Sequence, residues 1–138
     1  MKISTLIDTN ILVDVWGYTG PWTGWSQSAL VRCHGEGALL VNAIVWSEIA
    51  PSVDSNRLVA YADELDIERE DLPFDAAYDA GLAHALYRQS GGTRERTLPD
   101  FLIGAHAHHG GPRLLTRDPA RYRRYFPSIE IISPETHP

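Results

Sequence analysis

The sequence predicts an α/β domain in which helices cover both faces of a central parallel sheet. Short apolar runs at residues 3–7, 38–41, 113–116 and 129–132 have the length and composition of buried strands. Segments with helical spacing of apolar residues separate these runs, which is the order of βαβ units. The 138 residues suffice for one domain and are too few for two, so we expect a single domain over residues 1–138.

Five segments with helical spacing lie between the strands. They cover residues 25–34, 43–50, 58–65, 76–90 and 99–109. Asn42 and Asp75 are expected to cap the second and the fourth helix. Pro51 lacks an amide donor and is expected to kink or end the second helix, while Gly91 and Gly110 close the fourth and the fifth.

An aromatic-rich loop follows the first strand and a helical turn at residues 11–16. It runs from Trp16 to Trp25 and is broken by three glycines and a proline. Two interpretations stay open: the tryptophans form an apolar groove for a partner, or they pack on the core.

The charge is unevenly distributed along the chain. The formal net charge is −6, and nine acids lie between Asp54 and Asp79, whereas residues 113–124 carry five arginines and one acid. The only lysine is Lys2. With one cysteine, Cys33, and no apolar run of about 18 residues, we expect a cytoplasmic protein without a membrane span, in which Cys33 serves packing.

Three carboxylates are expected to meet at one edge of the sheet. Asp8 ends the first strand, Asp118 follows a later strand, and Asp100 begins the helix before that strand. Each also has a purely structural interpretation, because Asp8 and Asp118 can stabilise turns and Asp100 can favour a helix N-terminus. Glu48 lies in an apolar helical segment, so we expect it to be buried and to need a cation.

A cluster of four acids points to metal chemistry. Two carboxylates about 4 Å apart repel each other by roughly 4 kcal/mol at an effective dielectric constant near 20, so the cluster requires divalent cations. Oxygen ligands select Mg²⁺ or Mn²⁺ over Zn²⁺. Such a site activates water and stabilises charge on a phosphodiester, which predicts metal-assisted phosphodiester hydrolysis.

Four segments together resemble a known family in their order and spacing. They are residues 7–12 (IDTNIL), 47–49 (SEI), 99–107 (PDFLIGAHA) and 114–118 (LLTRD). With these segments the chain resembles, over nearly its whole length, the PIN-domain ribonucleases and among them the VapC-type toxins of type II toxin–antitoxin modules. Gly104 departs from the family pattern, where a larger small residue such as alanine is usual, and Pro51 follows Glu48 closely.

The resemblance implies a three-layer α/β/α sandwich and an Mg²⁺-dependent endoribonuclease, with Mn²⁺ able to substitute. Asp8, Glu48, Asp100 and Asp118 would form the metal site, with Asp8 and Asp100 as the foremost direct ligands. Asn10 and Thr116 would orient the acids, water or phosphate. The implied partners are RNA, a second copy of the chain, and a cognate antitoxin that fills an apolar groove and inserts a basic side chain among the acids.

Arginines beside the acids are candidates for binding RNA phosphates. The predicted contacts are Arg94, Arg96, Arg117 and Arg121. The alternative is that the arginines pair with the acidic segment from Asp54 to Asp79 or are solvated. Tyr122, Tyr125 and Trp22 are candidates for stacking on bases, although both tyrosines could equally belong to the core.

Other function classes fit less well. Haloacid-dehalogenase-like phosphatases and phosphorelay receiver domains both need a lysine late in the chain, and the former also need a second acid where Asn10 stands. Three histidines, His106, His108 and His109, are interpreted as structural residues of a helix end rather than as metal ligands. A catalytically inactive PIN-like module that binds RNA or docks proteins remains the alternative, and the presence of all four acids favours the enzyme.

Overall fold

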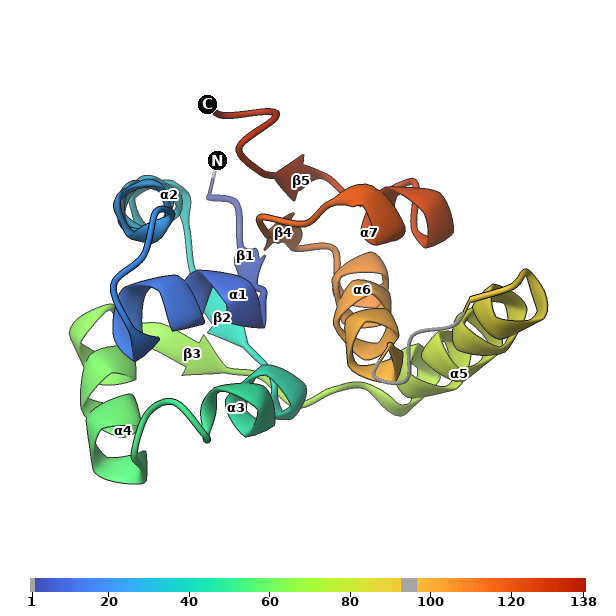
Figure 1. The fold of residues 1–138 in the computed structure, drawn as a ribbon, viewed down its shortest axis with the longest axis horizontal. Coiled ribbons are helices and arrows are strands. Elements are labelled where there is room, and N and C mark those ends of the chain that lie inside the picture. Colours follow the sequence, from blue (N-terminus) through green and yellow to red (C-terminus); the bar gives the residue numbers. More distant parts are fainter. Residues whose placement is uncertain (1, 93–96) are drawn as a thin grey trace.

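A computed structural model describes residues 2–92 and 97–138 and shows a three-layer α/β/α sandwich around a five-stranded parallel sheet (Figure 1). The strands are β1 (Thr5–Ile7), β2 (Leu39–Val41), β3 (Ile67–Arg69), β4 (Arg113–Leu115) and β5 (Ile131–Ile132). The helices are α1 (Thr9–Leu12), the π-helical turn η1 (Val13–Gly17), α2 (Thr23–Glu36), α3 (Ala43–Ile49), α4 (Ser55–Glu64), α5 (Phe74–Gln89), α6 (Leu98–Gly110) and α7 (Ala120–Tyr125). The predicted fold class is confirmed.

The strand order is β3-β2-β1-β4-β5, which places β1 in the centre of the sheet. Thr5 pairs with Leu39 of β2 on one side and with Arg113 of β4 on the other. The chain therefore builds outward from β1 to β3 and then crosses back to add β4 and β5. Between β1 and β4 the direction of winding reverses, and ligands of open α/β sheets bind in the crevice at such a point.

Most predicted elements are present, with shifted ends. The four predicted strands and the Asn42 cap of α3 are observed, and α3 ends at Ile49 before Pro51 as predicted. The strand β3 was not predicted, because Glu68 and Arg69 are exposed at the sheet edge and only Ile67 is buried. A charged edge strand protects the sheet from further pairing, but it lacks an apolar signal in the sequence.

The predicted cap of α5 is wrong. The helix begins at Phe74, so Asp75 lies in its first turn and Pro73 occupies the cap position in an extended conformation. Proline suits the start of a helix because no amide is lost there, and the carboxylate favours the positive end of the helix from within. Among the described residues, no helix is both long and apolar enough to cross a bilayer.

A small apolar cluster between α5, α6 and the end of α7 lies beside the main core. Gly104 of α6 makes this packing possible, because a Cβ atom there would lie 2.6 Å from the Phe126 ring and 3.0 Å from the Tyr122 ring. The glycine thus lets α7 approach α6 closely and brings Tyr122 inward. In the main core, Cys33 is fully buried, which confirms the packing role predicted for it.

Candidate functional site

All four predicted acids line one cleft, although they come from separate segments of the chain. The cleft has a volume of about 310 Å³ and lies at the carboxyl ends of β1 and β4, where the winding of the sheet reverses. Its lining residues are Asp8, Thr9, Asn10, Val13, Glu48, Asp100, Arg117, Asp118 and Tyr122. The sequence thus placed the acids at the correct edge of the sheet.

Asp8 is the most buried of these acids, with 5% of its surface exposed. It follows β1 directly and caps α1, since its Oδ1 accepts a hydrogen bond from the Thr9 amide at 2.7 Å. Its Oδ2 accepts from the hydroxyls of Thr116 at 2.7 Å and Tyr122 at 3.0 Å. Burial, aided by the charge of Asp100, raises the pKa of Asp8 to about 6 even though these hydrogen bonds lower it.

Thr116 connects three parts of the cleft. Its hydroxyl donates to Asp8 and accepts from the Asp118 amide at 3.0 Å and from Asn10 Nδ2 at 3.3 Å. The side-chain oxygen of Asn10 in turn accepts from the Arg117 amide at 3.2 Å. Because one hydroxyl carries one proton, the donation to Asp8 leaves Thr116 as an acceptor towards the other two groups. The arrangement suits the predicted orienting role of Asn10 and Thr116.

Tyr122 holds Asp8 in place, a role that was not predicted from the sequence. Its ring is buried, and burial together with the charge of Asp8 raises the pKa of the phenol well above its usual value. The phenol therefore stays protonated and donates to Asp8.

Thr9 is a second residue of the cleft whose role was not predicted from the sequence. It supplies its amide to Asp8 and its hydroxyl to Glu48 Oε1 at 2.7 Å.

Glu48 is exposed, and the expectation of a buried carboxylate is wrong. Val45 and Ile49 are the fully buried side chains of α3, and Glu48 lies at the border of that buried face, where it lines the cleft. Its apolar neighbours Ile44 and Trp46 are only half-buried, and the Glu48 side chain remains open to water. Glu48 is bound by the Thr9 hydroxyl and needs no cation for its own burial.

Asp100 lies in the first turn of α6, immediately after Pro99. It forms an ion pair with Arg121 of α7, whose guanidinium carbon lies 5.2 Å from the centre of the Tyr87 ring. Burial raises the pKa of Asp100, and the charges of Glu48 and Asp118 act in the same direction, while Arg121 opposes them. Both interpretations of Asp100 therefore hold, because it lies at the start of a helix and also lines the cleft.

The acids fit a hard divalent cation by the chemistry of their donors. All candidate ligands are oxygens, and no described residue donates a hydrogen bond to Asp100 Oδ1, Glu48 Oε2 or either carboxylate oxygen of Asp118. In the described part of the chain, no three His, Cys, Asp or Glu side chains stand as a complete ligand set. Because Arg121 already pairs with Asp100, a cation would have to share that carboxylate with the guanidinium.

The sequence matches the PIN domain family over residues 5–126. This chain belongs to the PIN domain family. No curated protein matches the sequence.

The PIN fold is also found in solved structures at low sequence identity. A chain in the crystal structure of VapBC2 from Rickettsia felis, bound to a DNA fragment from its promoter, is 18% identical with a TM-score of 0.70, covering 95% of this chain and 98% of that chain. A chain of DNA-bound VapBC from Salmonella typhimurium is 18% identical with a TM-score of 0.67 and the same coverage. A chain of a toxin–antitoxin complex from Klebsiella pneumoniae is 23% identical with a TM-score of 0.62, covering 94% and 97%.

Arginines of the PIN domain at residues 113–124 mostly pair with nearby carboxylates. Arg117 lies in the cleft and binds Asp14 through two hydrogen bonds of 2.6 and 3.0 Å. The other partners are Glu36 and Glu130 for Arg113, Asp100 for Arg121, and Glu135 for Arg123. The alternative that they pair with the acids between Asp54 and Asp79 is therefore wrong among the described residues. Arg94 and Arg96 lie outside the described residues.

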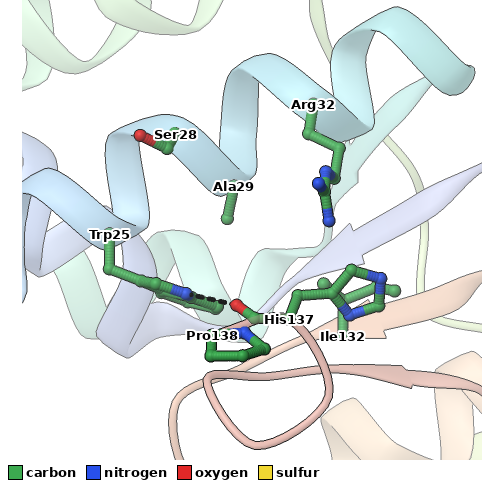
Figure 2. Close-up of a pocket in the computed structure, with 7 residues that line it drawn as sticks. All are labelled: Trp25, Ser28, Ala29, Arg32, Ile132, His137 and Pro138. Atoms are coloured by element: carbon green, nitrogen blue, oxygen red, sulfur yellow. Dashed lines mark hydrogen bonds between the residues drawn. The ribbon is translucent and has the colours of Figure 1, made fainter.

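Two tryptophans of the tryptophan-rich segment contact other parts of the PIN domain. Trp16 is buried against Tyr61, with ring centres 5.5 Å apart, and Trp25 Nε1 donates to the His137 carbonyl at 2.7 Å (Figure 2). Trp25 also lines a separate cavity of about 200 Å³ between α2 and the C-terminal segment, and this cavity shares no lining residue with the acid cleft. Trp22 stays partly exposed, with the Arg117 guanidinium carbon 5.6 Å from its ring centre.

The histidines of α6 each contact a protein partner. His106 is fully buried between Asn42, 3.0 Å from its Nδ1, and Glu70, 2.8 Å from its Nε2. His108 contacts Ser128 and His109 contacts Asp79. These contacts suit the structural role predicted for them.

Proposed function

We propose that this PIN domain is an Mg²⁺-dependent endoribonuclease and the toxin of a type II toxin–antitoxin pair, acting in the cytoplasm. The observation that carries the proposal is the convergence of Asp8, Glu48, Asp100 and Asp118 on one cleft. Oxygen donors of this kind bind Mg²⁺ or Mn²⁺. The similar folds in VapBC and other toxin–antitoxin complexes support the toxin assignment.

Within the cleft, each residue has a distinct role. Asp8 and Asp100 would be the foremost metal ligands, with Glu48 and Asp118 completing the acidic lining. A bound Mg²⁺ supplies Lewis acidity for phosphodiester hydrolysis. The hydroxyls of Thr116 and Tyr122 fix the Asp8 carboxylate in one orientation. Arg117 and Arg121 add positive charge beside the acids, where an RNA phosphate would lie.

Cleavage of a panel of structured RNAs by the purified protein tests the proposal. We expect cleavage with Mg²⁺ or Mn²⁺, loss of cleavage with EDTA, and loss of cleavage in Asp8→Asn prepared in the same way, which controls for contaminating nucleases. Cleavage that persists in Asp8→Asn or in EDTA would overturn the assignment. A folded protein that neither cleaves RNA nor binds Mn²⁺ in a calorimetric titration would instead be the inactive docking module.

The proposed antitoxin acts on the same acids. A basic side chain delivered to the cleft would compete with the metal for carboxylates such as Asp100, which already binds an arginine of its own chain. Co-expression with the protein of the adjacent gene should yield a stable complex that does not cleave RNA. A complex that cleaves at the rate of the free protein would contradict this inhibition.

A homodimer is the second proposed partnership, and α5 carries the surface for it. Phe74, Tyr78, Leu82 and Leu86 follow one another at intervals of four residues, and Phe74 is 93% and Tyr78 68% exposed. These residues form the outer face of α5. The opposite face of the helix packs on α6, and α5 lies at the edge of the molecule (Figure 1). A helix that is apolar on both faces is normally covered on both.

A second copy of the chain is the occupant that fits this outer face. A two-fold axis perpendicular to α5 places two copies of the helix antiparallel, so that Asp71 and Asp75 near the start of one helix approach Arg88 at the end of the other. Phe74 and Tyr78 together offer on the order of 300 Å². With the leucines, two copies would bury about 1,000 Å², which reaches the lower range of specific interfaces.

Sedimentation equilibrium tests the dimer. We expect the wild-type protein to be dimeric at micromolar concentrations and Tyr78→Glu to be monomeric with an unchanged circular dichroism spectrum. Val31→Glu is the matched control, because Val31 is an equally exposed apolar residue on α2 and should leave the dimer intact. A monomeric wild-type protein, or a Tyr78→Glu variant that stays dimeric, would overturn the proposal.

A further inference from the structure

A second cavity adjoins the acid cleft. It has a volume of about 270 Å³ and lies between α5 and the first turns of α7. Its lining residues are Tyr87, Asp118, Ala120, Arg121, Arg124 and Tyr125. Asp118 lines both this cavity and the acid cleft, so the two are neighbours on the surface. A linear polymer bound with its reacting bond at the acids would extend into this cavity.

The walls of the cavity combine aromatic rings with guanidinium groups. Tyr87 and Tyr125 meet edge to face, with ring centres 6.0 Å apart. The guanidinium carbon of Arg121 lies 5.2 Å from the centre of the Tyr87 ring, and that of Arg124 lies 5.5 Å from the centre of the Tyr125 ring. Unpaired nucleobases bind to surfaces of this kind, by stacking on aromatic rings or on the planes of arginines.

Among the described residues, Arg124 is the arginine of this cavity that has no carboxylate partner. The other arginines between residues 113 and 124 each form an ion pair with a carboxylate. Arg124 is exposed and forms no ion pair with any carboxylate of the described residues. A phosphate group could therefore bind Arg124 without displacing a carboxylate of the described residues.

We propose that this cavity binds the nucleotide next to the scissile phosphate of a single-stranded RNA segment. The base lies against the rings of Tyr87 and Tyr125, and the phosphate of that nucleotide contacts Arg124. The assignment rests on the proposed ribonuclease function and adds to it a subsite beside Asp118. It predicts that one position of the RNA is recognised by stacking, independently of the acids.

Binding of labelled single-stranded RNA, followed by fluorescence anisotropy in the non-cleaving Asp8→Asn background, tests the phosphate contact. Arg124→Gln should weaken binding about five-fold or more and lower the slope of log Kd against log salt by about one charge. Arg123→Gln is the matched control, since Arg123 is the exposed neighbour and pairs with Glu135 at 2.6 Å. It should change Kd less than about two-fold.

The stacked base is located by replacing each base of the RNA in turn with an abasic site. One position next to the cleavage site should lose about five-fold or more in affinity, and that loss should vanish in Tyr125→Leu, which keeps an apolar side chain at this position. The affinities for intact and abasic RNA are compared within the same variant, so a change in the overall stability of Tyr125→Leu does not affect the result.

The outcomes separate this assignment from the nuclease proposal. If the protein cleaves RNA, yet Arg124→Gln binds like Arg123→Gln and no abasic position depends on Tyr125, the subsite is wrong and the nuclease stands. If the protein neither binds nor cleaves RNA, both fail. If the Arg124 and Tyr125 effects appear with RNA that is bound but never cleaved, the cavity binds a nucleotide, but the nuclease proposal fails and with it the placement of that nucleotide next to a scissile phosphate.

Discussion

The two walls of the acid cleft hold their carboxylates in different ways. Asp8 is buried and receives hydrogen bonds from neutral donors, the hydroxyls of Thr116 and Tyr122 and the amide of Thr9. On the other wall, Glu48 and Asp118 are exposed, and Asp100 is bound by a cation of the same chain. Hydrogen bonds fix the position of Asp8 without cancelling its charge, because neutral donors supply no formal positive charge. The Asp8 wall therefore holds its carboxylate in a fixed position with an uncompensated negative charge, whereas the carboxylates of the opposite wall are exposed or paired and can adjust.

The largest expected difference between the walls concerns catalysis. Asp8→Asn should lower the rate of RNA cleavage by on the order of a thousand-fold, because a ligand with a fixed position is lost. Glu48→Gln, on the exposed wall, should lower it by roughly ten-fold, since water can replace an exposed carboxylate oxygen. Single-turnover cleavage rates at saturating Mg²⁺ measure both. Equal losses in the two variants would show that the walls do not differ in function.

The second difference concerns stability and pH. The pKa of Asp8 in the folded protein, about 6, lies above its value of 3.8 in an unfolded chain, so the folded state holds this proton more tightly. Between these two values stability therefore falls as pH rises, by at most about 3 kcal/mol, and above pH 6 the loss is complete.

Asp8→Asn removes this dependence, because asparagine has no proton to lose. The variant should be more stable than the wild type by about 1–3 kcal/mol at pH 7 and of similar stability near pH 4. Urea denaturation at both pH values gives the two differences directly. A variant that is destabilised at pH 7 would show that the hydrogen bonds to the ionised carboxylate outweigh its burial.

The positions of Asp8 and Asp100, one on each wall, could be predicted from the sequence, because their signals are local. The apolar run before Asp8 marks a strand end, and the Pro99-Asp100 pair marks a helix start. The partners of these acids could not be predicted. The packing of α7 on α6 brings Tyr122 to Asp8 and Arg121 to Asp100. Short-range sequence patterns do not predict such a contact between two helices.

The exposure of Glu48 was unpredictable for a related reason. Apolar residues surround it in the sequence, but α3 is short and buries only Val45 and Ile49 completely. Which side of a short, largely apolar helix faces the sheet is decided by the neighbouring elements rather than by its own composition. The missed strand β3 shows the converse, since its pairing with β2 outweighs its charged side chains.

A third prediction probes the packing that supports the rigid wall. Gly104→Ala should destabilise the protein by about 1–3 kcal/mol, because the added methyl group meets the rings of Phe126 and Tyr122. Gly35→Ala is the matched control in another helix, with nothing within 4 Å of its added Cβ, and should stabilise by about 0.5–1 kcal/mol. Thermal unfolding measures both variants. An unchanged or raised Tm for Gly104→Ala would mean that α7 moves freely and the wall is not rigid.

The smallest expected effect lies on the exposed wall. Thr9→Val removes the hydroxyl bound to Glu48 at 2.7 Å but keeps the amide that binds Asp8. Because Glu48 is solvated, the variant should lose less than about 1 kcal/mol of stability. Tyr122→Phe, which removes a donor to the buried Asp8, should lose more at pH 7. Chemical denaturation measures the loss of stability in both variants. A larger loss in Thr9→Val than in Tyr122→Phe would contradict the distinction between the two walls.

The central position of β1 governs when the acid cleft can exist during synthesis. Asp8 is made more than 100 residues before Thr116 and Tyr122, which hold it. Parallel pairing of β1 with β4 is a contact of long sequence separation, and such contacts form late in folding. N-terminal segments emerge and collapse first during translation, but here they cannot complete the cleft. A nascent chain is therefore unable to assemble the cleft before the segment that carries Thr116 and Tyr122 has left the ribosome.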